Sequence, residues 1–315
     1  MRRRSKTLQD IEPDHGTGVP FLNLGKPYYA VRDLHSVLSA DHQAGSQVDD
    51  DGKLLFADYS NYALQPVSTS GPYFVSGELI REDIVESQVG VPLVFEMQFI
   101  NTRTCTPIED LYLEVWQANA TGCYSGVASV DNGDSLSTLH VDEKGARQMT
   151  GGIVNESWLR GAQKTDASGV VRFKSVVPGW YTGRATHIHL LAHDPASVEK
   201  LENNTIATES TSNHTIRASH VGQVFFDASL LDRVAETHPY NSNTQWRIKN
   251  EDDAVLMQEG DTSDPVLQYV MLGNKIEDGI FAWMTIGIDP DVSTEVKVAA
   301  SWFESGGRMW RKLWH

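Results

Sequence analysis

The stretch Pro178-Gly179-Trp180-Tyr181-Thr182-Gly183-Arg184-Ala185-Thr186-His187-Ile188-His189 joins a turn to the start of a strand. Pro-Gly is a strong turn signal. His187 and His189 are two residues apart, so their rings lie on the same face if this segment is a strand. Two imidazoles on one sheet face can bind one metal ion. The pattern therefore predicts a metal-binding strand that begins directly after a loop.

Two tyrosines extend this candidate ligand set. Tyr181 lies six residues before His187, and Tyr124 follows the strand-like run Leu111–Trp116. Phenolate oxygen is a hard anionic donor, and together with imidazole nitrogen it suits ferric iron better than zinc or calcium. Such an ion would lower the pKa of both tyrosines far below their usual value of about 10.

With these residues the chain resembles the intradiol ring-cleavage dioxygenases, and most of all the secreted single-chain branch found in fungi and some plant-feeding arthropods. The resemblance spans the chain from Gly71 to Asp289, whereas the first 70 residues and the last 25 match no known pattern. Besides the Tyr-Arg-His-His stretch, the ordered matches are Gly71–Val75, Arg81–Ile84, Cys105–Ile108, Val115–Ala118, Leu159–Asp166, Gly222–Phe226, His238–Thr244 and Asp278–Trp283.

The resemblance implies a role for each residue of the site. Tyr124 matches an equatorial tyrosinate, Tyr181 an axial tyrosinate that leaves when substrate binds, and His187 and His189 the two histidine ligands. Arg184 matches an arginine that stabilises charge on the substrate ring. The implied cofactor is one Fe(III) per chain. The implied reaction uses O2 to open catechol-type diols between their hydroxyls, giving cis,cis-muconate-type products.

The substrate pocket is less sharply defined. The resemblance implies that Gly71, Pro72 and Tyr73 form one wall of it, although a plain turn into the first strand explains them equally well. Gln163 and Gln223 are candidates to orient a ligand or a pocket group. Structural hydrogen bonding is the alternative for both glutamines.

Short alternating runs separated by Gly, Pro, Asn and Asp predict an all-β fold, an antiparallel β-sandwich with long loops and a few short helices. We expect three parts: an irregular extension over 1–70, the catalytic sandwich over 71–290, and a C-terminal strand with a basic and aromatic tail over 291–315. The expected strands are Val94–Ile100, Leu111–Trp116, Val170–Val176, His187–Ala192, Gln223–Phe226, Val266–Leu272, Ala282–Ile288 and Thr294–Trp302. The expected helices are Val31–Leu38, Ala196–Leu201 and Ala228–Glu236.

Composition limits the partners and the compartment. A net charge of −16 argues against a nucleic-acid partner, and no apolar run is long enough for a transmembrane helix. Oligomeric state stays open. Cys105 and Cys123 flank one predicted strand, and the oxidising compartment that the sequons indicate favours a disulfide between them, with two free buried cysteines as the alternative. Secretion is expected from the glycosylation sequons, although no signal peptide is visible; the sequons are at Asn119, Asn155, Asn203 and Asn213.

Two other functions remain open at this point. His187 and His189 followed by His193 and Asp194 resemble the metal motif of cupins, which would bind ferrous iron or another divalent metal. A secreted β-sandwich that binds iron or an aromatic ligand without turnover is the second alternative. Colour separates the first from the ferric site, because tyrosinate bound to Fe(III) absorbs visible light. Oxygen uptake with catechol separates the second.

Overall fold

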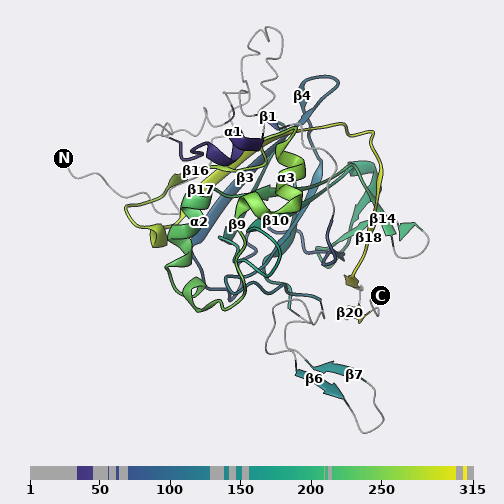
Figure 1. Cartoon of the computed structure of the whole chain (residues 1–315). Helices are drawn as coiled ribbons and strands as arrows, with labels where there is room; N and C mark the ends of the chain where they lie inside the picture. The colour runs from purple at the N-terminus through teal and green to yellow at the C-terminus, as the bar shows by residue number, and fades with distance from the viewer. Residues whose placement is uncertain are drawn as a thin grey trace, which may run out of the picture.

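The computed structural model describes residues 34–44, 56, 62–63, 70–127, 138–141, 147–150, 156–208, 210–211, 215–302 and 308–310. These residues form two packed β-sheets, several smaller sheets and a few short helices (Figure 1). The all-β fold expected from the sequence is confirmed.

The first sheet is built around β3, which pairs with β17 on one edge and with β4 and β9 on the other. The β3–β9 ladder is antiparallel, but β3 and β17 run parallel along their whole length. An antiparallel sandwich does not include this pairing. The chain between the two strands contains the whole second sheet, so it has ample length for the crossover that parallel strands need. The strands are β1 (Tyr62–Ala63), β3 (Pro92–Asn101), β4 (Thr106–Pro107), β9 (Val170–Val176), β16 (Gln268–Met271) and β17 (Ile280–Ile288).

The second sheet has the order β15-β10-β5-β8 and is antiparallel throughout. In β10 the even-numbered residues Ile188, Leu190 and Ala192 join the core between the two sheets. The odd-numbered residues therefore lie on the outer face. The strands are β5 (Tyr112–Gln117), β8 (Arg160–Lys164), β10 (His187–His193) and β15 (His220–Phe225).

Smaller sheets cover this outer face. A second apolar cluster joins Phe74 and Val75 to Trp116 and Leu191 of the second sheet. The predicted strand 294–302 is two strands that belong to different sheets. The small strands are β2 (Val75–Ser76), β6 (Thr138–Val141), β7 (Arg147–Thr150), β11 (Val198–Lys200), β12 (Ile206–Thr208), β13 (Ser210–Thr211), β14 (Thr215–Ala218), β18 (Thr294–Lys297), β19 (Ala300–Trp302) and β20 (Arg308–Trp310).

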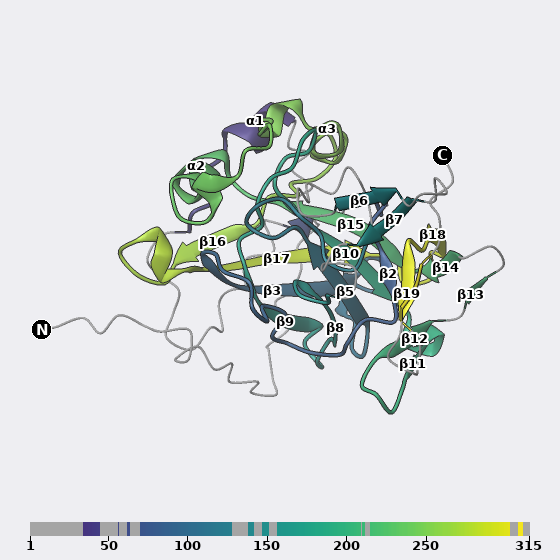
Figure 2. The same cartoon turned by 90° about the horizontal axis from the view of Figure 1, so that it is seen from below.

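The helices gather on one side of the sandwich (Figure 2). They are α1 (Leu34–Ser39), α2 (Ala228–Ala235) and α3 (Ala254–Gly260), with 3-10 turns η4 (Pro195–Ser197), η5 (Tyr240–Ser242), η6 (Asn250–Asp252) and η7 (Ile276–Asp278). In the part of the chain that the structure describes, no helix is long and apolar enough to cross a membrane. The helix predicted over 196–201 is wrong, because η4 ends at Ser197 and the next residues pair with β12 as a strand.

The predicted disulfide is also wrong. Cys105 lies exposed in the turn after β3, and Cys123 is buried against Trp158 and Leu159; the two are thiols. They flank β5, and a strand of six residues spans about 20 Å. A disulfide needs its two Cα atoms within about 7 Å; here Cys105 is exposed in the turn after β3 and Cys123 is buried in the loop after β5, and the two side chains are not joined.

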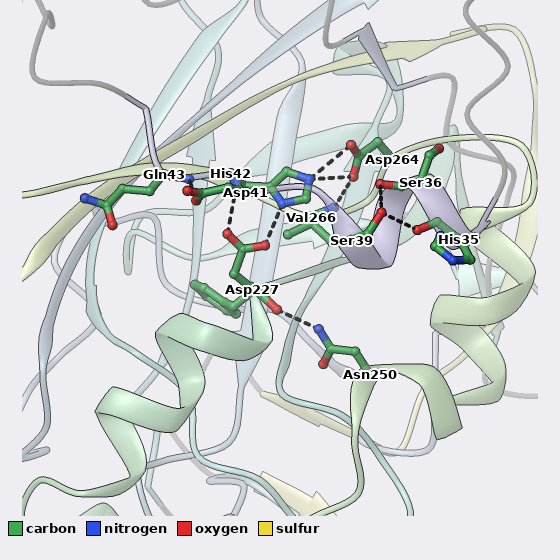
Figure 3. Close-up of polar contacts among 11 residues, drawn as sticks. His35, Ser36, Ser39, Asp41, His42, Gln43, Asp227, Asn250, Asp264 and Val266 are labelled. Carbon is green, nitrogen blue, oxygen red and sulfur yellow. Dashed lines mark hydrogen bonds and ion pairs between the residues drawn. The ribbon is translucent and has the colours of Figure 1, made fainter.

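His42 fixes the segment that follows α1 (Figure 3). The backbone N–H of His42 donates to Asp227 Oδ2 at 2.8 Å, and its ring nitrogens lie 2.6 Å from Asp227 Oδ1 and 3.1 Å from Asp264 Oδ2. Burial alone would lower the pKa of His42, but the hydrogen bonds and charges of the two aspartates outweigh it and raise the pKa to about 9. The ring is therefore an imidazolium at neutral pH and donates to both carboxylates.

This arrangement predicts a pH-dependent contribution to stability. The pKa of His42 is higher in the folded state than its ordinary value of 6.5, so the charge contributes fully below pH 6.5 and is lost as the pH rises through about 9. We expect His42→Gln to lower the free energy of unfolding, and the deficit to shrink by about 3 kcal/mol between pH 6 and pH 10. Urea unfolding across this range measures it. The exposed His35 on α1 supplies the control, since His35→Gln should change little; a deficit for His42→Gln that does not vary with pH would contradict the prediction.

Candidate metal centre

The two histidines lie where the sequence pattern expects them. His187 and His189 are buried on the outer face of β10, with Trp116 of β5 and Gln223 of β15 as the register partners of His189. The two Nε2 atoms are 3.0 Å apart. His187 Nδ1 donates to the carbonyl of Ala185 at 2.6 Å, which leaves the lone pair of the ring on Nε2.

The two tyrosines reach the same point from loops. The hydroxyl of Tyr124, from the loop after β5, lies 3.4 Å from His187 Nε2. The hydroxyl of Tyr181, from the loop between β9 and β10, lies at the same distance from that atom. The structure thus brings together two phenol oxygens and two imidazole nitrogens, and Tyr124 comes from 63 positions before His187 in the chain.

The geometry and protonation of this set fit a metal ion. Ligands about 2.1 Å from a common centre lie about 3.0–3.4 Å from one another at octahedral or tetrahedral angles, and the other three donor atoms lie 3.0, 3.4 and 3.4 Å from His187 Nε2. Burial, aided by the charge of Arg184, lowers the pKa of His187 to about 3. Burial, aided by His187, lowers the pKa of His189 well below its ordinary range. Both rings are therefore neutral, and a cation bound to both would replace the repulsion between their lone pairs with two bonds.

The phenols need such a cation in order to ionise. Burial raises the pKa of Tyr181 to about 12. Burial also raises the pKa of Tyr124 well above its ordinary value, and the neighbouring Tyr181 raises it further. Without a metal both stay protonated at neutral pH. In the described residues no group of three or more His, Cys, Asp and Glu side chains could hold a metal ion. A metal at this site would therefore depend on the tyrosines as well as the histidines.

Arg184 lies beside the ligand set and is held in place. Its Nε donates to Asp253 Oδ2 at 2.9 Å, and its Nη2 donates to Gln223 Oε1 at 2.6 Å. Asp253 is completely buried and also accepts from Ala185 N at 2.7 Å and from the first N–H groups of α3. The sequence reasoning missed Asp253 and α3, although an aspartate before an apolar run is a helix start signal that could have shown both.

The predicted pocket residues divide into two groups. Tyr73 packs its ring 4.8 Å from that of Tyr124, and Gly71 lies so close to His189 that an added Cβ would be 3.1 Å from Cε1. Pro72, between them, is exposed. Gln223 reaches the site through Arg184, as described above. Gln163 does not, because its register partner is the core residue Leu113, which places it on the opposite face of the sheet from the histidines.

The cupin alternative is wrong for this chain. His193 Nε2 lies 2.6 Å from Glu114 Oε1, and both side chains are buried. Asp194 is exposed, and its side chain caps η4 by accepting from Ala196 N. Neither side chain is among the groups that meet at His187 Nε2.

The sequons have mixed settings. The side-chain oxygen of Asn119 accepts from Thr121 N at 3.1 Å and from Cys123 N at 3.0 Å, so this residue shapes the turn before Tyr124. Asn203 is exposed. Asn155 and Asn213 lie outside the described residues. Glycosylation stays a prediction at all four positions.

No protein-family model and no curated protein matches this chain. Solved structures do. The intradiol ring-cleavage dioxygenase from Tetranychus urticae is 25% identical, with a TM-score of 0.55 over 73% of this chain and 96% of that one. A second dioxygenase structure is also 25% identical, with a TM-score of 0.55 over 74% of this chain and 97% of its own. The family resemblance is thereby confirmed: the chain has the motifs and the fold of the intradiol ring-cleavage dioxygenases.

Gly71 allows a test of the ligand geometry that needs no substrate. Its φ is +66°, and an added Cβ would press on His189. We expect Gly71→Ala to displace His189 and to reduce the iron retained after dialysis several-fold, measured by metal analysis. Gly77→Ala, at another left-handed glycine in the same segment (φ 90°), adds comparable backbone strain and serves as the control. Equal iron retention in both variants would show that the contact with His189 does not matter.

Proposed function

We propose that the chain is a non-haem Fe(III) intradiol dioxygenase that uses O2 to cleave catechol-type diols between their hydroxyls, giving cis,cis-muconate-type products. The observation that carries the proposal is the convergence of two phenol oxygens and two imidazole nitrogens at one point beside Arg184. The similarity to the Tetranychus urticae enzyme, which bears the name intradiol ring-cleavage dioxygenase, supports it.

In this proposal Tyr124, Tyr181, His187 and His189 hold one Fe(III). Two phenolates and two neutral imidazoles form a dianionic set that suits a 3+ ion. When bound, the iron supplies a Lewis acid and a template for a catecholate and O2.

The surroundings of the two tyrosines support different roles for them. Tyr124 is almost completely buried and packs against Tyr73 and Tyr181. Tyr181 is only partly buried, and its neighbours Thr182 and Gly183 are exposed. Tyr181 is therefore the tyrosine that can move aside, and its phenolate oxygen can accept a proton from a hydroxyl of the diol. Tyr124 stays in place as the permanent anionic ligand.

Arg184 is the proposed catalytic residue that stabilises negative charge on the substrate. Its guanidinium cannot lose its proton at physiological pH, and Asp253 and Gln223 fix its orientation without reorganisation. A positive charge held in this way stabilises the negative charge that builds up on the diol ring in the transition state.

We also propose that the protein is a secreted glycoprotein, on the basis of its four sequons. Expression through a secretory host tests this, since treatment with an N-glycosidase should lower the mass of the secreted protein. An unchanged mass would argue against glycosylation.

The central experiment is a panel of diols assayed for oxygen uptake and product spectrum. Catechol, methylcatechols, hydroxyquinol, protocatechuate and caffeate cover the substrates left open by the sequence. The iron-loaded protein should absorb visible light, take up one O2 per diol and form a muconate-type product. Binding without oxygen uptake would instead identify a binding module, and full occupancy by zinc without colour would reject the ferric site.

Replacing Arg184 separates iron binding from turnover. Because Arg184 cannot be a ligand, Arg184→Ala should keep its iron and its colour, while the oxygen uptake rate falls by on the order of a hundredfold or more. Arg217→Ala, which removes an exposed arginine on β14, is the control and should leave the rate unchanged. A parent-like rate for Arg184→Ala would remove this residue from the mechanism.

A further inference from the structure

The four candidate ligands are held in two different ways. The histidines belong to β10, which pairs with a strand on each side. The tyrosines lie on two loops, Asn119–Tyr124 and Pro178–Arg184, outside any ladder of strands. The positions of the phenol oxygens relative to the imidazoles therefore depend on the contacts that join these loops to each other and to the rest of the chain.

A backbone hydrogen bond, from Gly179 N to the carbonyl of Asn119 at 3.1 Å, and one amide side chain join them. Gln245 Nε2 donates to the carbonyl of Thr121 at 3.0 Å, and Gln245 Oε1 accepts from Thr182 N at 3.3 Å. Thr121 lies three residues before Tyr124, and Thr182 directly follows Tyr181. The NH2 group of the Gln245 side chain thus binds the loop that carries Tyr124, and its oxygen binds the loop that carries Tyr181.

The segment around Gln245 also grips Trp180. The indole Nε1 donates to the carbonyl of Gln245 at 3.0 Å, and Asn243 Nδ2 donates to the carbonyl of Trp180 at 2.8 Å. The guanidinium of Arg247 lies over the Trp180 ring, 5.5 Å from its centroid. The side chains of Asn243 and Arg247 and the backbone carbonyl of Gln245 therefore all act on Trp180, the residue next to Tyr181.

The two loops touch backbone to backbone, and Gln245 lies in the seam. A Cβ at Gly122 (φ +84°) would be 2.2 Å from the carbonyl oxygen of Trp180 and 2.4 Å from Gln245 Nε2. A Cβ at Gly179 would be 2.3 Å from the carbonyl oxygen of Ala120. These approaches leave no room for a residue larger than glycine at either position. Gln245 therefore bridges two loops whose backbones are already in close contact.

We propose that Gln245 is a positioning residue of the metal centre, which sets the spacing of the Tyr124 and Tyr181 oxygens by linking their loops. The inference rests on the proposed function. The hydrogen bonds of the Gln245 side chain go to the backbone at Thr121 and Thr182, so its effect on the site passes through the backbones of the two loops. The two equal distances of 3.4 Å to His187 Nε2 are the geometry that it maintains.

Two variants of Gln245 separate hydrogen bonding from packing. Gln245→Met keeps the length and bulk of the side chain and removes both hydrogen bonds. Gln245→Glu keeps an acceptor for Thr182 N and loses the donor to Thr121. Asn241→Ala is the matched control, because it removes one amide that donates to a backbone carbonyl, Glu236 O at 3.3 Å, on a nearby exposed turn.

The first readout is amide hydrogen exchange of the metal-free protein, measured by mass spectrometry on peptides that contain Thr182. We expect exchange about fivefold faster in Gln245→Met than in the parent, a smaller effect in Gln245→Glu, and parent rates in Asn241→Ala. Parent exchange in Gln245→Met would overturn the proposed link between the loops.

The second readout is the visible absorption band of the iron-loaded protein, with iron content and kcat. Gln245→Met should shift the band, retain less iron and lower kcat, whereas Asn241→Ala should match the parent in all three. An unshifted band with parent iron content and kcat would overturn the positioning role. A parent protein that binds no iron would instead refute the proposed function, and the exchange data would still decide whether Gln245 joins the loops.

Discussion

The site depends on one constraint, the pairing of β10 on both of its edges. Its ladders with β5 and β15 fix which side chains enter the core and which lie on the outer face. Ile188 and Leu190 fill the space between the sheets, and His187 and His189 are thereby directed outward. A slip of one residue would exchange these two sets, burying two imidazoles in the apolar core. The strand pairing that stabilises the sandwich therefore also sets the register of the two histidines.

Arg184 gives this geometry its electrostatic character. Its charge lowers the pKa of both histidines and also opposes the rise that burial causes in the pKa of Tyr124 and Tyr181. One guanidinium thus favours neutral imidazole and ionised phenol, the protonation states in which these groups bind metals. Asp253 compensates this buried charge and at the same time caps α3, so the start of that helix and the position of Arg184 are coupled.

Polar side-chain contacts help to hold the peripheral segments to this centre. His42, between Asp227 and Asp264, ties the segment after α1 to the start of α2 and to the chain that leads into β16 (Figure 3). Gln245 does the same for the two tyrosine loops. In both cases one side chain with two polar ends joins segments that are distant in sequence. Loops without ladder hydrogen bonds need such bridges to keep a defined position.

The sequence by itself determined the strand nature of most segments, the common face of His187 and His189, and the set of residues with ligand chemistry, because these follow from local periodicity and residue type. Only the tertiary structure decided that β3 and β17 run parallel, that Gln163 faces away from the site, that Cys105 and Cys123 are not bonded to each other, and that Asp253 and Gln245 support the centre. Each of these depends on which distant segments pack together. Periodicity reports the face on which a residue lies, but not the neighbour that it meets there, since that neighbour is chosen by the packing of the whole chain.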